Sequence, residues 1–410
     1  MIRQLIGLGI MAAVLQGAQV DLSSAMKRFL EANDDLLIAR NEPLKAKADI
    51  ITAHEHPNPL WNTTYEFMNI EKRFNDQARG SNAQLTSSLI HTIETISKRD
   101  KRVNLATLTA EYQELIYQDA LRLRTADLLE AYFDLLEDQY DLDNAKANRK
   151  SFDQLLEVAK AKMDHGFLSA MDYQKLLLQK IDYDKEAHSA LLSLQQDRQK
   201  LAMMLVVSAE DLTVSPVMAS MMILPSLDTM LEGASKRVDC EAAKKSSMVA
   251  QADWVMQKAL ATPNVNVMAE YASFGPLYEP LLGVGVSMPL PIFDRNAGDI
   301  EKARITTLQA REIYDKTLRH AQAEITTSYQ TYYAHLNLYK TLQAGYESAK
   351  DLKEKQEKLF AIKGISILEL LDGQKNFRDY QKAFIHGETQ IHKAALLVKL
   401  QAGLPVSEGL

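Results

Sequence analysis

Carboxylates at two corresponding places are the side chains best placed to do chemistry in this sequence. Asp172 lies three residues after Ser169, and Glu369 lies three residues after Ser366, with Asp372 almost one helical turn further on. A serine followed by such an acid is typical of a helix N-terminus, where the helix dipole also favours negative charge. If several copies of the chain surrounded an opening, the same acids would form rings that favour cations and respond to pH and divalent ions. The sequence leaves both interpretations open.

Motifs for enzymatic chemistry are absent from the sequence. It contains no His-Glu-x-x-His, no Gly-x-Ser-x-Gly and no phosphate-binding loop, and the pair Gly283 and Gly285 lacks the third glycine of a dinucleotide site. His54 and His56 are two residues apart and therefore do not share a helix face, so a polar helix end explains them better than a metal site. We expect no enzyme, no cofactor and no resident metal.

The charge balance and the cysteine count limit the partners and the covalent structure. The chain has 47 basic and 54 acidic residues, which gives a net charge of -7 and argues against nucleic acid as a partner. Cys240 is the single cysteine, so an internal disulfide is impossible. Stability must come from packing or from assembly.

The first 18 residues predict a secretory signal peptide. Arg3 supplies a positive charge, an apolar stretch follows from Leu5 to Leu15, and small residues end the segment near Ala18. A buried N-terminal helix is the alternative, but Gly7 and Gly9 interrupt the apolar stretch. No later segment offers 18 uninterrupted apolar residues.

An internal repeat organises the rest of the chain. At an offset of 197 residues, the segment around Ser169 and Asp172 corresponds to the segment around Ser366 and Glu369. Each half is predicted to run helix, two strands, a very long helix, a turn and another long helix. The expected domains are a signal peptide (1–18), a first repeat (19–215), a linker (216–226), a second repeat (227–404) and a short tail (405–410).

The long helices are predicted from the scarcity of helix breakers. Residues 100–165 contain neither Gly nor Pro, and a helix of that length would extend about 100 Å. Leucines recur every seven residues at 121, 128, 135 and 142, which is typical of helices that pack side by side as in coiled coils. Pro43 falls within the first predicted helix and is expected to bend it.

Alternating segments predict four strands, at about 60–70, 84–94, 263–274 and 282–291. Val265, Val267 and Tyr271 share one face, while Asn266 and Glu270 share the other. This pattern suits a membrane β-barrel or, alternatively, half-buried soluble hairpins. Four strands cannot close a barrel, so copies must assemble. Two copies give eight strands around a filled interior, whereas three give twelve strands and a lumen that a helical tube would continue.

Two motifs resemble the TolC-type outer-membrane efflux protein family. They are the segment from Gly283 to Asn296, similar to the family's strand-to-helix exit, and the segment from Ser366 to Gln374, similar to its helix-hairpin tip. The stretch from Met288 to Asn296 is most similar to the branch that serves heavy-metal, cobalt-zinc-cadmium type efflux.

This resemblance implies a mainly α fold with a trimeric, twelve-stranded β-barrel, four strands per chain, continued by a periplasmic α-helical barrel. It also implies a periplasmic adaptor (membrane fusion) protein, an inner-membrane RND-type pump and outer-membrane lipid as partners. By position, Glu369 and Asp372 match the family's acidic periplasmic gate, and Asp172 is their counterpart in the first repeat.

The resemblance assigns adaptor docking to the helix-hairpin tips, which comprise Gly166, Ser169, Lys363, Gly364 and Ser366. The family's tip glycine is present at Gly166, but Lys363 occupies the equivalent place in the second half, with Gly364 one residue later. This departure leaves the conformation of the second turn in question.

The expected function is a passive exit duct that conducts substrates, with heavy-metal cations as candidates, from the pump and adaptor to the outside. The alternative is a periplasmic coiled-coil adaptor or tethering protein without a pore. Such a protein would explain the helices and the signal peptide, but not two alternating hairpins at matching positions.

Overall fold

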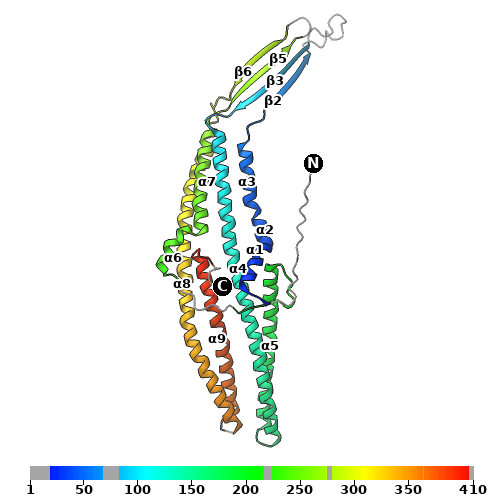
Figure 1. Ribbon diagram of the computed structural model, residues 1–410, viewed down its shortest axis with the longest axis vertical. Coiled ribbons are helices and arrows are strands. Elements are labelled where there is room, and N and C mark those ends of the chain that lie inside the picture. The colour runs from blue at the N-terminus through cyan, green and yellow to red at the C-terminus, as the bar shows by residue number, and fades with distance from the viewer. Residues whose placement is uncertain (1–18, 68–82, 217–223, 275–278, 363, 406–410) are drawn as a thin grey trace. The chain divides into compact units, whose positions relative to one another are not determined.

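A computed structural model of the chain describes residues 19–67, 83–216, 224–274, 279–362 and 364–405 (Figure 1). The first half contains α1 (Leu22–Ala32), α2 (Asp34–Ala39), α3 (Asn41–His54), β2 (Leu60–Phe67), β3 (Ala83–Ile93), α4 (Lys98–Asp164) and α5 (Ala170–Leu205). The second half contains α6 (Leu227–Gly233), α7 (Val238–Leu260), β5 (Val265–Ser273), β6 (Leu281–Ser287), α8 (Ala297–Ala361) and α9 (Ile367–Gln401). A short 3₁₀ turn (Ala234–Lys236) lies between α6 and α7. The element order of the first half therefore recurs in the second.

The chain forms two compact units, and each unit takes segments from both halves of the sequence. The sheet unit comprises residues 40–118 and 238–318, and the helical unit comprises the segments up to 39, 119–237 and 319–410. Helices α4 and α8 contribute residues to both units.

The sheet unit holds one antiparallel sheet of four strands in the order β2-β3-β5-β6. Trp61 pairs with Leu89, Leu89 pairs with Ala269, and Ala269 pairs with Val284. The two hairpins, whose paired residues are 172 or more positions apart in sequence, thus form a continuous ladder, and within the described residues β2 and β6 have unpaired outer edges.

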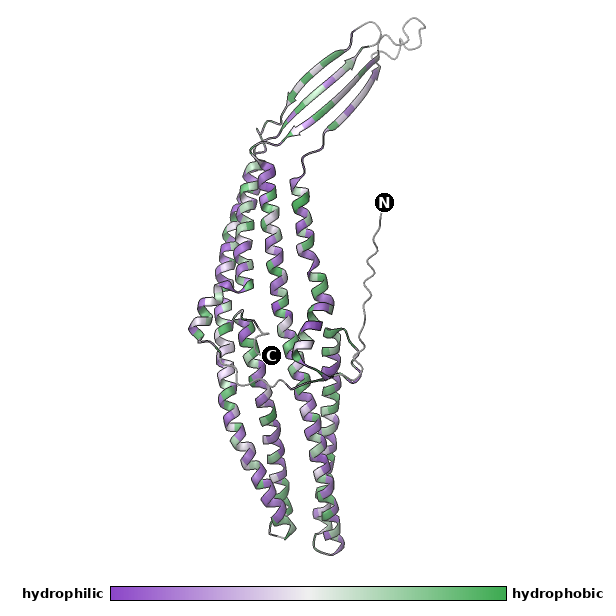
Figure 2. Cartoon of the chain, viewed as in Figure 1, coloured by the Kyte–Doolittle hydropathy of each residue, from purple (hydrophilic) through white to green (hydrophobic). Residues whose placement is uncertain are grey.

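The register gives the sheet an apolar face and a polar face, because residues paired across strands point the same way. The apolar face carries Trp61, Tyr65, Leu85, Leu89, Ile93, Val265, Val267, Tyr271, Leu282, Val284 and Val286, together with Thr63, Ser87, His91, Ala269 and Ser273. The polar face carries Asn62, Thr64, Glu66, Gln84, Thr86, Ser88, Thr92, Asn266, Glu270, Gly283, Gly285 and Ser287. Apolar residues on this second face are Leu60, Ile90, Met268, Ala272 and Leu281. Hydrophobic residues lie along all four strands (Figure 2).

Strand β6 ends at Ser287, earlier than the alternation to residue 291 predicts. Pro289 and Pro291 have no N–H to donate to a ladder, and the N–H of Ile292 turns back to the Leu290 carbonyl oxygen (2.8 Å). The alternation of apolar residues therefore continues after Ser287, but the strand ends there.

The helical unit has a core built on the leucine repeat of α4. Leu128 and Leu135 are fully buried, Leu142 is buried, and Leu121 packs against the same cluster. Tyr132, also on α4, donates its hydroxyl to the carbonyl oxygens of Val20 (3.1 Å) and Ser215 (2.8 Å). These carbonyls flank two short parallel strands, β1 (Gln19–Val20) and β4 (Thr213–Val214), which Tyr132 fixes to α4.

The first predicted helix is divided into three. Helix α1 ends at Ala32 and α2 ends at Ala39, so Pro43 is the third residue of a new helix, α3. The interruption after Ala39 lies where the N–H that Pro43 lacks would have bonded, four residues before the proline, and in the first turn of α3 that N–H needs no partner within the helix.

Several sequence-based predictions lie outside the described residues. These are the signal peptide (1–18), strand residues 68–70, the part of the linker at 217–223, Lys363 and the tail from 406. None of the described helices combines the length and the hydrophobicity that crossing a lipid bilayer requires.

Candidate functional site

The turn between α4 and α5 is shaped by Gly166. Its φ of 77° is in the left-handed region, which glycine adopts without the strain of a Cβ atom. The Gly166 N–H donates to the Met163 carbonyl oxygen (2.9 Å), and the Phe167 N–H donates to that of Lys162 (2.7 Å). These two bonds satisfy carbonyl groups that the helix end would otherwise leave unpaired.

The turn between α8 and α9 keeps part of this pattern at the offset of 197 residues. The Gly364 N–H donates to the Leu359 carbonyl oxygen (2.7 Å), which matches the bond of Phe167 in the first turn. Gly364 is therefore equivalent to Phe167 in this pattern. A Cβ at Gly364 would approach the Leu359 side chain to 3.2 Å, so close packing suffices to explain a glycine there.

Ser169 and Asp172 form the N-terminal cap of α5. The Ser169 hydroxyl accepts from the Asp172 N–H (3.0 Å) and donates to the Asp172 carboxylate (2.8 Å), and Lys175 lies 3.0 Å from that carboxylate. The Ser169 hydrogen bond and the Lys175 ammonium group hold the pKa of Asp172 below its usual value. Asp172 is thus a permanent negative charge at neutral pH.

Ser366 and Glu369 form a full capping box at the start of α9. The Ser366 N–H donates to Glu369 Oε2 (2.8 Å), and the Ser366 hydroxyl accepts from the Glu369 N–H (3.3 Å). These bonds from Ser366 lower the pKa of Glu369. Asp372 is exposed one turn later and accepts from the Asn376 amide (3.3 Å).

The two hairpin tips pack against each other inside the helical unit. A cluster of buried side chains from all four helices holds them: Phe152, Leu156 and Ala159 of α4, Leu176 and Tyr183 of α5, Phe360 of α8, and Ile367 and Leu370 of α9. The Lys162 ammonium group also donates to the Phe360 carbonyl oxygen (2.7 Å). The structure therefore brings the helix ends beside the two turns into one region.

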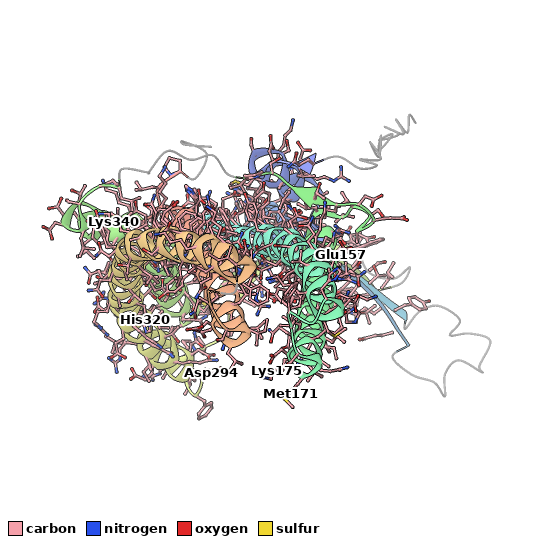
Figure 3. All side chains as sticks on the ribbon, turned by 90° about the horizontal axis from the view of Figure 1, so that it is seen from below. Glu157, Met171, Lys175, Asp294, His320 and Lys340 are labelled. Atoms are coloured by element: carbon pink, nitrogen blue, oxygen red, sulfur yellow. The ribbon has the colours of Figure 1, made fainter. Side chains whose placement is uncertain are left out.

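A shallow groove of about 460 Å³ runs between α5 and α9 near these tips. Its walls are Lys175, Leu178, Gln179, Ile181, Asp182, Leu368 and Leu371. Leu178, Ile181 and Leu368 are each at least 60% exposed, and so is Met171 beside them. Figure 3 shows Met171 and Lys175 projecting from the end of α5. The tip thus combines apolar surface with carboxylates.

Sequence reasoning missed a second polar cluster, formed where α4 packs against α9. Its bonds join Asp134 to Lys393 (2.9 Å), Glu137 to Gln390 (2.7 Å), Asp141 to His386 (2.8 Å) and Asp141 to Lys382 (2.7 Å). The acids fall at helical spacing on α4, and the basic residues do so on α9. This matching spacing of acidic and basic residues is the sequence signal from which the cluster could have been predicted.

Burial changes the proton affinities in this cluster. Burial and the nearby Asp197 raise the pKa of Asp138 to about 7, from an ordinary value of 3.8. The Asp141 hydrogen bond raises the pKa of His386. For Asp141, the bonds from His386 and Lys382 outweigh the opposing effect of burial, and its pKa is lowered. Asp138, which lies on α4 close to Asp197 of α5, is therefore a carboxyl group that titrates near neutral pH.

Metal ligation has no candidate site among the residues that the structure describes. No three His, Cys, Asp or Glu side chains converge there in a way that could hold an ion. His54 lies in the last turn of α3 and its carbonyl oxygen accepts from Arg99 (2.7 Å), as a polar helix end would.

Comparison with solved structures identifies the fold. A membrane protein from Pseudomonas aeruginosa matches with a TM-score of 0.81 at 18% identity, over 93% of this chain and 90% of that one. CusC, whose structures concern transmembrane channel formation, matches with a TM-score of 0.81 at 15% identity, over 96% of both chains. The outer-membrane channel OprN matches with a TM-score of 0.79 at 16% identity, over 94% of this chain and 90% of that one.

This chain has the fold of the TolC-type outer-membrane channels. The resemblance inferred from the strand-exit and hairpin-tip motifs is thereby confirmed, as is the mainly helical, duplicated fold class in its coarse form.

The sequence is also similar to that of a metal-resistance protein. The cobalt-zinc-cadmium resistance protein CzcC of Cupriavidus metallidurans is 24% identical over 302 residues, which cover 72% of this chain and 68% of that protein. No protein-family model matches the chain. The relative agrees with the heavy-metal branch that the segment from Met288 to Asn296 resembles.

Proposed function

We propose that this protein is the outer-membrane exit duct of a tripartite efflux system. It conducts substrates passively, because the energy and direction of transport come from a partner pump. The TolC-type fold and the sequence likeness to CzcC support this assignment. We propose no enzymatic activity and no cofactor.

The two-faced sheet carries the proposal. Its apolar face exposes large side chains, with Val284 92% and Trp61 72% accessible to solvent, while its other face is mostly polar or small. A soluble protein would bury such a face, whereas a transmembrane barrel turns it toward lipid and lines its lumen with the other.

Barrel closure requires further copies of the chain. Lipid does not tolerate open strand edges, and β2 and β6 run in opposite directions, so β6 of one copy can pair antiparallel with β2 of the next. We propose a homotrimer with twelve strands, since eight strands would enclose a filled interior. The long helices would then form an α-helical barrel on the periplasmic side.

The proposed domains follow from this assembly. A cleaved signal peptide (1–18) would send the chain across the inner membrane, the repeats at 19–215 and 227–404 would each supply two strands and two long helices, and the segments at 216–226 and 405–410 would join and end them.

The hairpin tips are the proposed periplasmic gate and docking site. Asp172, Glu369 and Asp372 would form acidic rings around the opening, while Gly166, Ser169, Lys363, Gly364 and Ser366 would shape the turns that a periplasmic adaptor protein contacts. The lowered pKa values of Asp172 and Glu369 support a permanent negative charge there. Behind the adaptor, an inner-membrane RND-type pump would supply the substrate.

Heavy-metal cations are the proposed substrate class. The name of the relative CzcC and the acidic tip both favour cations. No nucleic-acid partner is proposed for a chain with a net charge of -7.

Planar-bilayer recording tests the duct directly. The purified protein should insert in discrete conductance steps that prefer cations over anions. A protein that is soluble in the periplasm and produces no conductance would contradict the duct and favour the tethering protein instead.

A further inference from the structure

The chain passes from the sheet into a long helix twice, and both passages expose an apolar side chain at the same place. Ile96 lies between β3 and α4, Phe293 lies between β6 and α8, and the repeat offset of 197 residues relates them. Ile96 is 48% exposed and Phe293 is 99% exposed. Single exposed apolar residues are common, but two at matching positions of a repeat indicate surroundings that both passages share.

Each of these side chains ends an apolar surface that begins on the sheet. Ile93, three residues before Ile96, is on the apolar face and is 49% exposed. Leu290, three residues before Phe293, is 65% exposed. In both passages a polar segment with a basic residue begins one position later. The apolar surface therefore stops abruptly at Ile96 and at Phe293.

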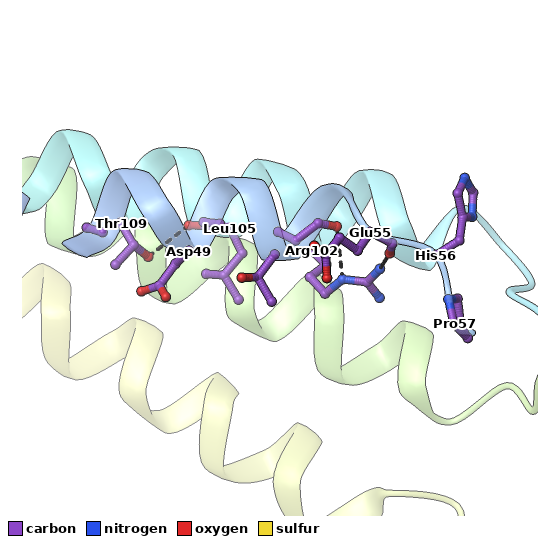
Figure 4. A pocket seen from close by; sticks show the side chains of 11 residues that line it. Asp49, Glu55, His56, Pro57, Arg102, Leu105 and Thr109 are labelled. Carbon is purple, nitrogen blue, oxygen red and sulfur yellow. Dashed lines mark hydrogen bonds between the residues drawn. The ribbon is translucent and has the colours of Figure 1, made fainter. Parts of the chain in front are cut away.

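The first passage ties its charged side chains inward. Lys98 is only 4% exposed, and its ammonium group donates to the Asn264 side-chain oxygen (2.5 Å). Arg102 donates to the Glu55 carbonyl oxygen (2.9 Å) at the end of α3, as Figure 4 shows. Ile96, two residues before the buried lysine, stays at the surface. Surfaces that face water favour the reverse arrangement, with the charge outside and the apolar side chain inside.

Strand geometry places Ile96 at a membrane boundary, a step that rests on the proposed barrel. The apolar face of β3 runs from Leu85 to Ile93, which is about 27 Å along the strand and about 20 Å along the axis of a barrel whose strands tilt by about 40°. The apolar band of such barrels is about 25 Å tall. Ile96 lies at most about 10 Å further toward α4, at the level of the lipid headgroups. The repeat places Phe293 likewise.

A neighbouring copy of the chain does not account for both positions. Strand β3 pairs with β2 and β5 of its own chain, so Ile96 follows an inner strand, whereas Phe293 follows β6 at an open edge. The lumen of the proposed barrel is lined by the polar face, but Ile93 leads to Ile96 from the apolar face. The surroundings that both passages share are therefore the lipids around the barrel.

We propose that Ile96 and Phe293 are interfacial anchors, which insert among the phospholipids of the periplasmic leaflet at headgroup level. Their side chains gain free energy by leaving water, and the basic residues that follow, such as the exposed Arg295, can reach lipid phosphates. A ring of these anchors around the barrel fixes the depth of the sheet in the membrane. It also holds the starts of α4 and α8 at the membrane surface.

Depth-dependent fluorescence quenching tests the anchors. The full-length protein, with Ile96→Cys or Phe293→Cys labelled by a fluorescent maleimide, is reconstituted into phospholipid vesicles that carry a nitroxide near the top of the acyl chain. Cys240 is fully buried, so the label goes to the introduced thiol. Both labels should be quenched by the nitroxide lipid and protected from aqueous iodide. The matched control, Asp299→Cys on exposed α8 surface, should be quenched by iodide alone.

A label at Val284→Cys separates failure of the anchors from failure of the barrel. Val284 is on the apolar face of the sheet and 92% exposed, so the nitroxide lipid should quench it in any inserted barrel. If it is quenched while the labels at Ile96 and Phe293 respond to iodide or to neither quencher, the lumen or another copy covers them and the anchors are wrong. If the lipid quenches none of the three labels, the barrel proposal fails as well.

Charge substitution tests whether the anchors set the depth. Ile96→Asp with Phe293→Asp should draw the junction toward water, which brings a label at Val284→Cys nearer to a shallow nitroxide and further from a deep one. The conservative pair, Ile96→Leu with Phe293→Trp, should leave the ratio of shallow to deep quenching unchanged. A ratio in the aspartate variant equal to that of the natural sequence would overturn the depth-setting role.

Discussion

Glu369 and Asp372 show how acidic residues at the start of a helix can also carry charge at the opening of the proposed pore. Glu369 caps α9, yet its side chain is exposed and ionised, so capping does not remove its charge from the opening. Replacing Glu369 by Gln keeps a residue that can complete the capping box while removing the charge. We expect Glu369→Gln with Asp372→Asn to weaken cation preference and to enlarge the conductance in planar bilayers, with unchanged thermal stability.

The control for this pair is Asp379→Asn, an exposed acid further along α9. It should leave ion preference unchanged. If the tip double variant and the control both conduct as the natural protein does, Glu369 and Asp372 are helix caps and not a gate.

Asp138 and His386 make the helical unit sensitive to pH. The folded-state pKa of Asp138, about 7, lies above its ordinary 3.8, so its contribution to stability is complete at acidic pH and is lost as pH rises through 7. The raised pKa of His386 acts in the same direction: its contribution is present below 6.5 and is lost as pH rises through the folded-state value. We therefore expect the unfolding temperature to fall from about pH 4 to about pH 7 because of Asp138, and to fall further above pH 6.5 because of His386.

Asp138→Asn should reduce this dependence, and Asp143→Asn, an exposed site on the same helix, should leave it intact. Circular dichroism of the detergent-extracted protein provides the measurement. An unfolding temperature that rises over this interval, or that ignores Asp138→Asn, would contradict the assignment.

Residue-level prediction succeeded where the signal was local. The capping acids follow from a serine with an acid three residues later, so Asp172 and Glu369 could be placed at helix starts without a structure. The cluster of Asp141 and His386 joins residues 245 positions apart, and only the packing of α4 on α9 brings them together.

At the scale of elements, Gly166 determines how α4 turns into α5. Gly166→Ala would force a Cβ into the left-handed region at a cost of about 1–2 kcal/mol, although nothing else lies near that Cβ. We expect a lower unfolding temperature for Gly166→Ala. Gly233→Ala is the matched control, since its backbone is right-handed helical and its surroundings are equally open. Equal stability of both variants would contradict the role of Gly166.

The long helices were predictable because breakers are so scarce, and α4 departs from the expected span by two residues at its start and one at its end. Where an observed element boundary differs from the predicted one, the difference lies at a proline or at a short polar residue. Asn33 accepts from the Leu36 N–H (3.2 Å) and separates α1 from α2, and the prolines after Ser287 end β6. Such local competition changes boundaries without changing the order of elements.

At the scale of the whole molecule, the four-stranded sheet of a single chain has two unpaired edges, β2 and β6, within the described residues. The alternation of residues predicted two faces, and the register shows that all four strands contribute to both. Pairing of the two hairpins into one sheet required the structure, because sequence alternation does not specify which strands are neighbours. Neither the sequence alternation nor the structure of the single chain gives the number of copies, because that number depends on contacts between chains.

The mass of the detergent-extracted outer-membrane protein tests the central claim most directly. Native mass spectrometry of the membrane fraction should find an assembly of three chains that dissociates on heating. A monomer, found in the soluble periplasmic fraction, would contradict the barrel and with it the duct.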